Sequence, residues 1–141
     1  MELTLPFKNM ENIQDKYTCK GQSVSPEIKI ANIPKAAKSL AIIVDDPDAP
    51  YGTFVHWVAW NLAAANIPEG AKSGVQGVNT AGKLGYTPPC PPPGKPHRYI
   101  FNVYALGTQL DLAAGAAKEE LLQAMEGHIL AKAESTGLFK R

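Results

Sequence analysis

Cysteine, net charge and long apolar runs are all scarce in this sequence, and each scarcity excludes a class of protein. No run approaches the ~20 apolar residues that a membrane-spanning helix needs. Lys and Arg number 14 and Asp and Glu 13, so the 141-residue chain carries a formal net charge of +1. A charge this small gives no general attraction to nucleic acid or to an anionic membrane. We therefore expect no nucleic-acid partner and no stable insertion into a membrane.

The two cysteines, Cys19 and Cys90, lie far apart in the sequence. They allow at most one internal disulfide, and without a Cys-x-x-Cys pair a zinc cluster has little support. The first residues, Met1 to Met10, include Glu2 and lack the apolar core of a signal peptide. We expect a cytoplasmic protein with reduced thiols and no cofactor.

Proline is concentrated in one place. Six of the 12 prolines lie between Pro88 and Pro96, where the missing backbone donors exclude a helix or a central strand. The segment is either a stiff ordered loop or a free polyproline ligand for an SH3-like partner. Because it leads directly into an apolar run, we expect it to be pinned at the rim of a pocket.

Hydrophobic patterning predicts several strands and a single helix. The helix is predicted over Ala116–Glu126 because four apolar residues share one face and Gly127 is a natural end. The final segment, Ile129–Phe139, fits a strand better than a continued helix. The other predicted strands are Leu40–Val44, Phe54–Leu62 and Arg98–Leu106, with shorter candidates at Glu2–Leu5 and Glu27–Ala31.

Long antiparallel strands, many turns and one late helix predict a mainly β protein, a β-rich sandwich. The length favours a single domain over residues 1–141. A Rossmann fold is disfavoured because the gaps between the strands are loop-like. The Phe54–Leu62 strand is apolar on both alternating faces, so we expect it to be covered on both sides.

Polar residues gather at the ends of these strands, beside loops rich in proline and glycine. Asp46 and Asp48 follow the first long strand, and His97 and Tyr99 begin the third. Strand alternation places His97 and Tyr99 on one face. It places His56 on one face with Phe54, Val58 and Trp60. A lone histidine in an apolar strand is more often a core residue than a ligand contact, so spacing alone leaves both interpretations open.

Several of these motifs together carry a family resemblance. They are Asp46-Pro47-Asp48-Ala49-Pro50, His56 in FVHWVAWN, Gly85-Tyr86 and Pro96-His97-Arg98-Tyr99, with Tyr17-Thr18-Cys19, Ser25-Pro26 and Glu126–Leu130. In this combination the sequence resembles the phosphatidylethanolamine-binding protein family. The resemblance is closest to its bacterial and archaeal branch, the Raf-kinase-inhibitor-like proteins, and covers nearly the whole chain.

The resemblance implies a β-sandwich of two antiparallel sheets with Greek-key connections, and a small anion pocket at one end of it. It also implies that the Ala49–Pro50 peptide is cis. A departure from the family pattern at Thr87-Pro88, where many relatives have glycines, removes one backbone donor. The ligand-binding residues that the resemblance implies are Asp46, Asp48, Pro50, His56, Gly85, His97 and Tyr99.

The residue types in this implied pocket suit an anion. Imidazole N–H groups and the Tyr99 hydroxyl can donate to phosphate oxygens, and the Gly85 backbone N–H is a further donor. Asp46 is a poor direct contact for phosphate, so we expect it to orient a histidine.

The expected function is non-enzymatic binding of phosphate or of a phospholipid headgroup such as phosphoethanolamine. The resemblance adds a protein kinase or a serine protease as a regulated partner and leaves a homodimer open. The alternative is a hydrolase that uses the same pocket, either through a metal held by His56, His97 and Asp46 or through a Ser-His-Asp triad. No Gly-x-Ser-x-Gly motif supports the triad.

Overall fold

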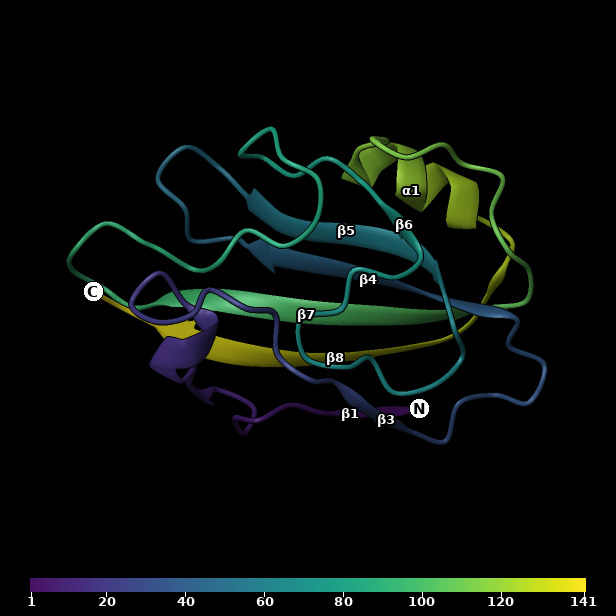
Figure 1. Ribbon diagram of the computed structural model, residues 1–141, viewed down its shortest axis with the longest axis horizontal. Helices are drawn as coiled ribbons and strands as arrows, with labels where there is room; N and C mark the ends of the chain where they lie inside the picture. Colours follow the sequence, from purple (N-terminus) through teal and green to yellow (C-terminus); the bar gives the residue numbers. More distant parts are fainter.

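A six-stranded sheet and a two-stranded sheet form the computed structural model, which describes all residues from 1 to 141 (Figure 1). One short helix, α1 (Lys118–Met125), and a 3-10 turn at Asp15–Tyr17 complete the regular structure. The strands are β1 (Glu2–Thr4), β2 (Glu11–Asn12), β3 (Lys29–Ala31), β4 (Ser39–Asp46), β5 (Phe54–Leu62), β6 (Val75–Gln76), β7 (His97–Leu106) and β8 (Ile129–Phe139).

The large sheet has the strand order β2-β8-β7-β4-β5-β6, and β1 pairs with β3 in the small one. Strands β4, β5 and β6 follow one another, and a long connection then returns the chain to place β7 beside β4. This is the Greek-key order. All pairs are antiparallel except β2 with β8. The predicted fold class, mainly β with two sheets and one short helix, is confirmed.

Both faces of the large sheet are buried, which explains the continuous apolar runs of its central strands. Leu40, Ile42 and Val44 of β4 face the core beneath β1 and β3. The alternate residues Ala41 and Ile43 face a second core, which α1 covers. Figure 1 shows α1 on one side of the sheet and the β1–β3 pair on the other. The expectation that β5 is covered on both faces is confirmed.

The helix is a few residues shorter than predicted and begins at Lys118. Its N-terminus is capped by Glu120, whose Oε1 accepts the backbone N–H of Ala117 at 3.1 Å. Leu121 and Met125 bury against the sheet, and Gly127, at a φ of 78°, ends the helix in a left-handed conformation. None of the helices in the structure has the length and apolar character needed to cross a bilayer.

Strand β5 contains a bulge, so its side chains do not alternate in the way that was predicted. The register against β4 shifts between the pairs Val44–Trp57 and Asp45–Val55, which leaves His56 as the extra residue. One extra residue reverses the phase of a strand. Phe54 and His56 therefore face the same side as Trp57, whereas Val58 and Trp60 pack into the second core. The prediction that His56 shares a face with Val58 and Trp60 was wrong.

Two further expectations about covalent geometry were wrong. Cys19 and Cys90 form a disulfide with a Cα–Cα distance of 5.4 Å, so these thiols are not reduced. The loop that carries Cys19 lies against the proline segment, and the Cys19 backbone N–H donates to the Pro89 carbonyl at 3.1 Å. This packing brings together cysteines that are remote in sequence. There is no cis peptide bond in the chain, so Ala49–Pro50 is trans.

Candidate functional site

A cavity of about 330 Å³ opens at one end of the large sheet, where β4 ends and β5 and β7 begin. Its walls come from three sources: the strand ends, the turn after β4 and the proline segment. The lining residues are Asp46, Ala49, Pro50, Tyr51, Phe54, His56, Thr87, Pro88, Cys90, Pro91, Pro92 and Tyr99. Antiparallel pairing of β4 with both β5 and β7 brings these segments to the same end of the sheet.

Asp46 is the acidic residue of the cavity, and both of its oxygens are engaged. Oδ2 accepts a hydrogen bond from Nδ1 of His97 at 2.7 Å, and Oδ1 accepts the backbone N–H of Asp48 at 2.8 Å. Both Asp46 and His97 are buried. The carboxylate thus holds the His97 ring in one orientation, which is the contact expected of Asp46.

Asp48 faces away from the cavity and pairs with Arg98. The carboxylate accepts three hydrogen bonds, from the Arg98 backbone N–H and from Nε and Nη2 of its guanidinium, at 2.9 to 3.0 Å. The guanidinium holds the pKa of Asp48 below its ordinary value. This bidentate pair ties the turn after β4 to the first residues of β7 and so fixes one wall of the cavity.

His56 supplies an imidazole whose protonation pattern is fixed by its neighbour. Its Nδ1 lies 2.7 Å from the carbonyl oxygen of Thr87. A carbonyl only accepts, so Nδ1 carries the hydrogen and Nε2 is the unprotonated atom of the neutral ring. Nε2 has no partner in the protein and is not sealed from solvent. Burial is the main cause that lowers the pKa of His56.

Two aromatic rings flank His56. The ring of Phe54 is tilted against it at a centroid distance of 4.6 Å, and Tyr99 meets it edge-on at 5.2 Å. Burial first, and then the negative charges of Asp46 and Asp48, raise the pKa of the Tyr99 hydroxyl. Tyr99 therefore stays protonated and remains a hydrogen-bond donor at physiological pH.

The proline segment is an anchored wall of this cavity. Pro88, Pro91 and Pro92 line it, and Cys90 ties the segment to Cys19. A further contact comes from Arg141, whose Nε donates to the Pro91 carbonyl at 2.6 Å. These contacts confirm the expectation of a pinned loop over that of a free polyproline ligand. The prolines also make the rim apolar and leave it with few N–H donors.

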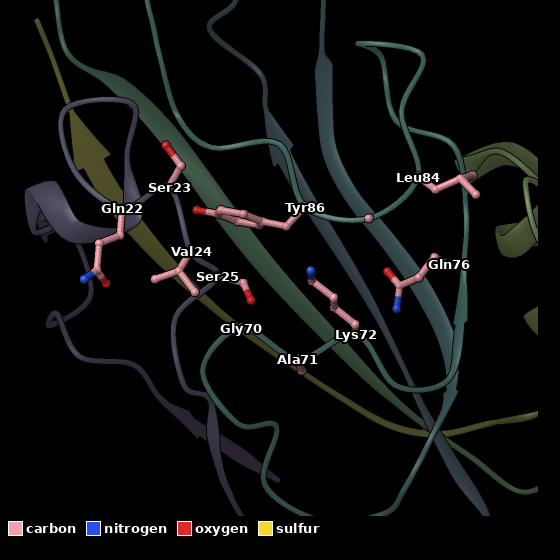
Figure 2. A pocket seen from close by; sticks show the side chains of 11 residues that line it. Gln22, Ser23, Val24, Ser25, Gly70, Ala71, Lys72, Gln76, Leu84 and Tyr86 are labelled. Carbon is pink, nitrogen blue, oxygen red and sulfur yellow. The ribbon is translucent and has the colours of Figure 1, made fainter.

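Gly85 lies elsewhere. It lines a separate, open groove of about 700 Å³, whose lining side chains are shown in Figure 2, whereas Thr87 and Pro88, the residues that follow Tyr86, line the cavity. Its backbone N–H points to the Gly77 carbonyl at 3.4 Å. The structure therefore brings together Asp46, Pro50, His56 and Tyr99 around the cavity. It places His97 behind Asp46, Asp48 against Arg98, and Gly85 on the other groove.

Sequence reasoning missed three partners at this site: the Thr87 carbonyl, Arg98 and the disulfide at Cys90. A backbone carbonyl leaves no mark in a sequence. Arg98 stands directly after His97, but its pairing with Asp48 depends on the pairing of β4 with β7, which the sequence does not show. No group of three or more His, Cys, Asp or Glu side chains is arranged to hold a metal ion, and no serine lines the cavity.

Comparison with known proteins places these features in a family. The family model described as phosphatidylethanolamine-binding protein matches residues 4–140. The chain belongs to the phosphatidylethanolamine-binding protein family. The match includes every element that builds the cavity, and it supports a binding protein of this class.

Close relatives occur in bacteria and archaea. A UPF0098 protein of Pyrococcus abyssi is 51% identical over 146 residues, which cover 96% of this chain and 82% of that protein. A UPF0098 protein of Chlamydia muridarum is 50% identical over 150 residues, covering 100% of this chain and 99% of the relative. Both matches run over most of each chain, so the resemblance is one of whole domains.

Solved structures show the same fold. A Chlamydia trachomatis protein described as a homologue of phosphatidylethanolamine-binding protein superposes with a TM-score of 0.94 at 44% identity, covering 99% of this chain and 97% of that one. YbcL of Escherichia coli, described as a member of the mammalian family, gives a TM-score of 0.89 at 28% identity, covering 99% and 98%. The cavity thus sits in a fold shared with experimentally determined members.

Proposed function

We propose that the cavity beside His56 binds a small anionic group, either free phosphate or the phosphate of a lipid headgroup, without catalysing a reaction on it. The observation that carries the proposal is the hydrogen bond from His56 Nδ1 to the Thr87 carbonyl. It directs the one unpartnered nitrogen of a buried ring, Nε2, toward a ligand. Phosphate oxygens are suitable partners once Nε2 is protonated.

Charge around the cavity supports this assignment. Burial disfavours the charged form of His56 and lowers its pKa, so the ring is neutral at pH 7 when no anion is bound. An anion at Nε2 compensates the positive charge of imidazolium, and binding therefore draws a proton onto His56. The Tyr99 hydroxyl adds a donor that does not ionise, and the hydrogen bonds from His97 and Asp48 reduce the negative charge that Asp46 presents to the anion.

The size and lining of the cavity limit what enters it. A volume of about 330 Å³ lies at the small end of the ~300–1,000 Å³ range of ligand sites. It suits a headgroup rather than a whole lipid. The rim of Pro50, Tyr51 and Phe54 is apolar, which accommodates the ester group next to a phosphate.

The test is calorimetric titration with dimethyl phosphate, phosphoethanolamine and inorganic phosphate in buffers of different ionisation enthalpy. We expect uptake of a proton on binding near pH 7 and weaker diester binding at higher pH. In His56→Gln the uptake disappears. The third histidine of the chain, His128, is exposed, and His128→Gln is the matched control that should bind as the wild type does.

The same experiment separates binding from catalysis. Incubation with p-nitrophenyl phosphate and p-nitrophenyl acetate should give no turnover above the buffer rate. Binding without proton uptake, or equal uptake in His56→Gln, would remove His56 as the anion contact. Turnover that depends on His56 would instead support the hydrolase alternative.

A further inference from the structure

The open groove of about 700 Å³ that Gly85 and Tyr86 line contains a buried hydroxyl that has no partner. Ser25 is 3% exposed, and its Oγ makes no hydrogen bond within the protein. The only side-chain atom that is sealed from solvent without a partner is Oδ1 of Asp45, so the Ser25 hydroxyl opens onto the groove that the residue lines.

Ser25 is held rigidly in this position. Its carbonyl accepts the backbone N–H of Gly70 at 3.0 Å, which joins the two loops that form one side of the groove. A hydroxyl on a fixed backbone needs little ordering when a ligand binds, and that lowers the entropic cost of binding.

A second donor faces the hydroxyl. Lys72 is the only charged residue that lines the groove, and it forms no ion pair with any carboxylate of the chain. In Figure 2 its ammonium points back toward the middle of the groove, among the side chains of Ser25, Tyr86 and Gln76. The groove therefore presents one unneutralised positive charge and no negative charge.

Gln76 is preorganised as a third donor. Its Oε1 accepts the indole N–H of Trp57 at 3.0 Å, which fixes which end of the amide is oxygen. Its Nε2 donates one hydrogen to the Ser73 carbonyl at 2.8 Å. An amide nitrogen has two hydrogens, so one remains for a ligand.

The rest of the lining combines the polar side chains of Gln22 and Ser23 with an apolar wall. Tyr86 presents its ring, which is fixed because its hydroxyl donates to the Tyr17 carbonyl at 2.8 Å and its edge meets Trp57. Val24 and Leu84 complete this surface, and Leu84 is 60% exposed. Hydrogen-bond donors and an apolar wall in one concave surface are the usual composition of a small-molecule site.

From these contacts we propose that the groove is a second ligand site, separate from the cavity beside His56, for an organic anion that carries a carboxylate or phosphate on an apolar body. The oxyanion lies at the ammonium of Lys72, which in Figure 2 has Ser25 on one side and Gln76 on the other. The apolar body packs on the ring of Tyr86. A ligand of this kind satisfies the Ser25 hydroxyl and the charge of Lys72 at once.

The test is an NMR titration of the ¹⁵N-labelled protein with benzoate, phenyl phosphate and benzamide. Benzoate and phenyl phosphate share an aromatic body and differ in the oxyanion, whereas benzamide is the neutral counterpart of benzoate. We expect saturable shifts of the backbone amides of Ser25, Lys72 and Tyr86 with both anions, and at least tenfold weaker binding of benzamide. The ratio of the two anion affinities then identifies which oxyanion the groove prefers.

Substitutions locate the contacts. Lys72→Met and Ser25→Ala should each weaken benzoate binding by about tenfold, the usual size of a charge-assisted hydrogen bond. Lys35→Met removes another exposed lysine, which lies outside the groove, and should leave the affinity unchanged. His56→Gln should also leave the benzoate affinity unchanged, so this variant distinguishes binding in the groove from binding in the cavity beside His56.

Three results would overturn the proposal. They are the absence of saturable shifts at these amides, equal affinity for benzamide, and unchanged benzoate affinity in both Lys72→Met and Ser25→Ala. The amide spectrum of the same sample shows whether each variant is folded.

Discussion

Asp46 and His97 form a buried hydrogen-bonded pair, Oδ2 to Nδ1 at 2.7 Å, between strands β4 and β7. The pair lies directly behind the cavity that Asp46 lines. The carboxylate therefore has two roles. It holds two adjacent strand ends together through His97, and it lines the cavity in which we propose that the anion binds. Removing it should affect both stability and binding.

The first prediction concerns Asp46→Ala. The variant leaves the buried Nδ1–H of His97 without an acceptor, which should lower the free energy of unfolding by about 2 kcal/mol. It should also weaken phosphate binding by about 10–100-fold, the range found at metal sites when a supporting partner is lost, because the Asp46–His97 pair holds the start of β7, which carries Tyr99, against the end of β4. Urea denaturation and calorimetry measure the two effects.

Asp111→Ala is the control for Asp46→Ala. It removes the same charge from an exposed position outside the cavity, and both measurements should match those of the wild type. If Asp46→Ala instead bound phosphate more tightly, repulsion of the anion would be the dominant effect of the carboxylate.

The second prediction follows from the lowered pKa of His56. The ordinary histidine value is about 6.5, and the unfolded chain regains it. Between the two pKa values the unfolded state binds more protons than the folded state, so stability rises with pH there. The contribution of His56 is complete above about pH 6.5 and is lost as the pH falls through the lower, folded pKa.

Thermal unfolding between pH 7.5 and pH 5 measures this dependence. The melting temperature of the wild type should fall on acidification, and that of His56→Gln should fall less. His128→Gln, with an exposed histidine replaced, should follow the wild type. Equal slopes for the wild type and His56→Gln would show that His56 is not buried as a neutral ring.

Much of the fold was predictable because the central strands are apolar on both faces. The segments Phe54–Leu62 and Ile129–Phe139 match β5 and β8 residue for residue. Strands β2 and β6 were not predicted, since each has only two residues and is defined by pairing with a neighbour. Such pairs depend on tertiary contacts rather than on local pattern.

The site was less predictable than the fold, and the reason is local geometry. The bulge at His56 turns its ring toward the cavity, and no period-two pattern contains that extra residue. Asp48 belongs to the same motif as Asp46, yet its side chain turns outward because Arg98 offers a bidentate partner. Motif membership identified these residues, and only the packed structure separated those that line the cavity from those that support it.

The third prediction tests the packing under β8. A Cβ added to Gly137 would contact Ile13 and lie 2.7 Å from Cε2 of Phe7, both core residues. Overpacking of this kind costs about 1–3 kcal/mol. Gly137→Ala should therefore lower the free energy of unfolding by that amount in urea denaturation.

Gly107→Ala is the matched control for Gly137→Ala. An added Cβ there meets only the Leu130 side chain, at an ordinary distance of 3.6 Å. Its free energy of unfolding should stay within about 0.5 kcal/mol of the wild type, as for most substitutions without a steric conflict. Equal destabilisation by the two substitutions would mean that crowding against Ile13 and Phe7 does not determine the effect, since the lower entropy of the unfolded chain alone would stabilise both variants.

The last prediction concerns the disulfide between Cys19 and Cys90, which closes a loop with a sequence separation of 71. By the chain-entropy relation a crosslink of this span stabilises the folded state by about 4 kcal/mol. Reduction by a dithiol, or the double substitution Cys19→Ser with Cys90→Ser, should lower the free energy of unfolding by that order. The reduced wild type and the double variant should agree with each other.

The disulfide also bears on the cavity, because Cys90 lines it between Pro88 and Pro91. Without the crosslink that wall is held by the Cys19–Pro89 backbone hydrogen bond and by Arg141. Ligand binding then has to order the proline segment, and the entropic cost of that ordering reduces the affinity. We expect severalfold weaker binding of dimethyl phosphate after reduction, measured well below the melting temperature, with recovery on reoxidation. Unchanged affinity in the reduced protein would show that the remaining hydrogen bonds are sufficient to hold the proline segment in place.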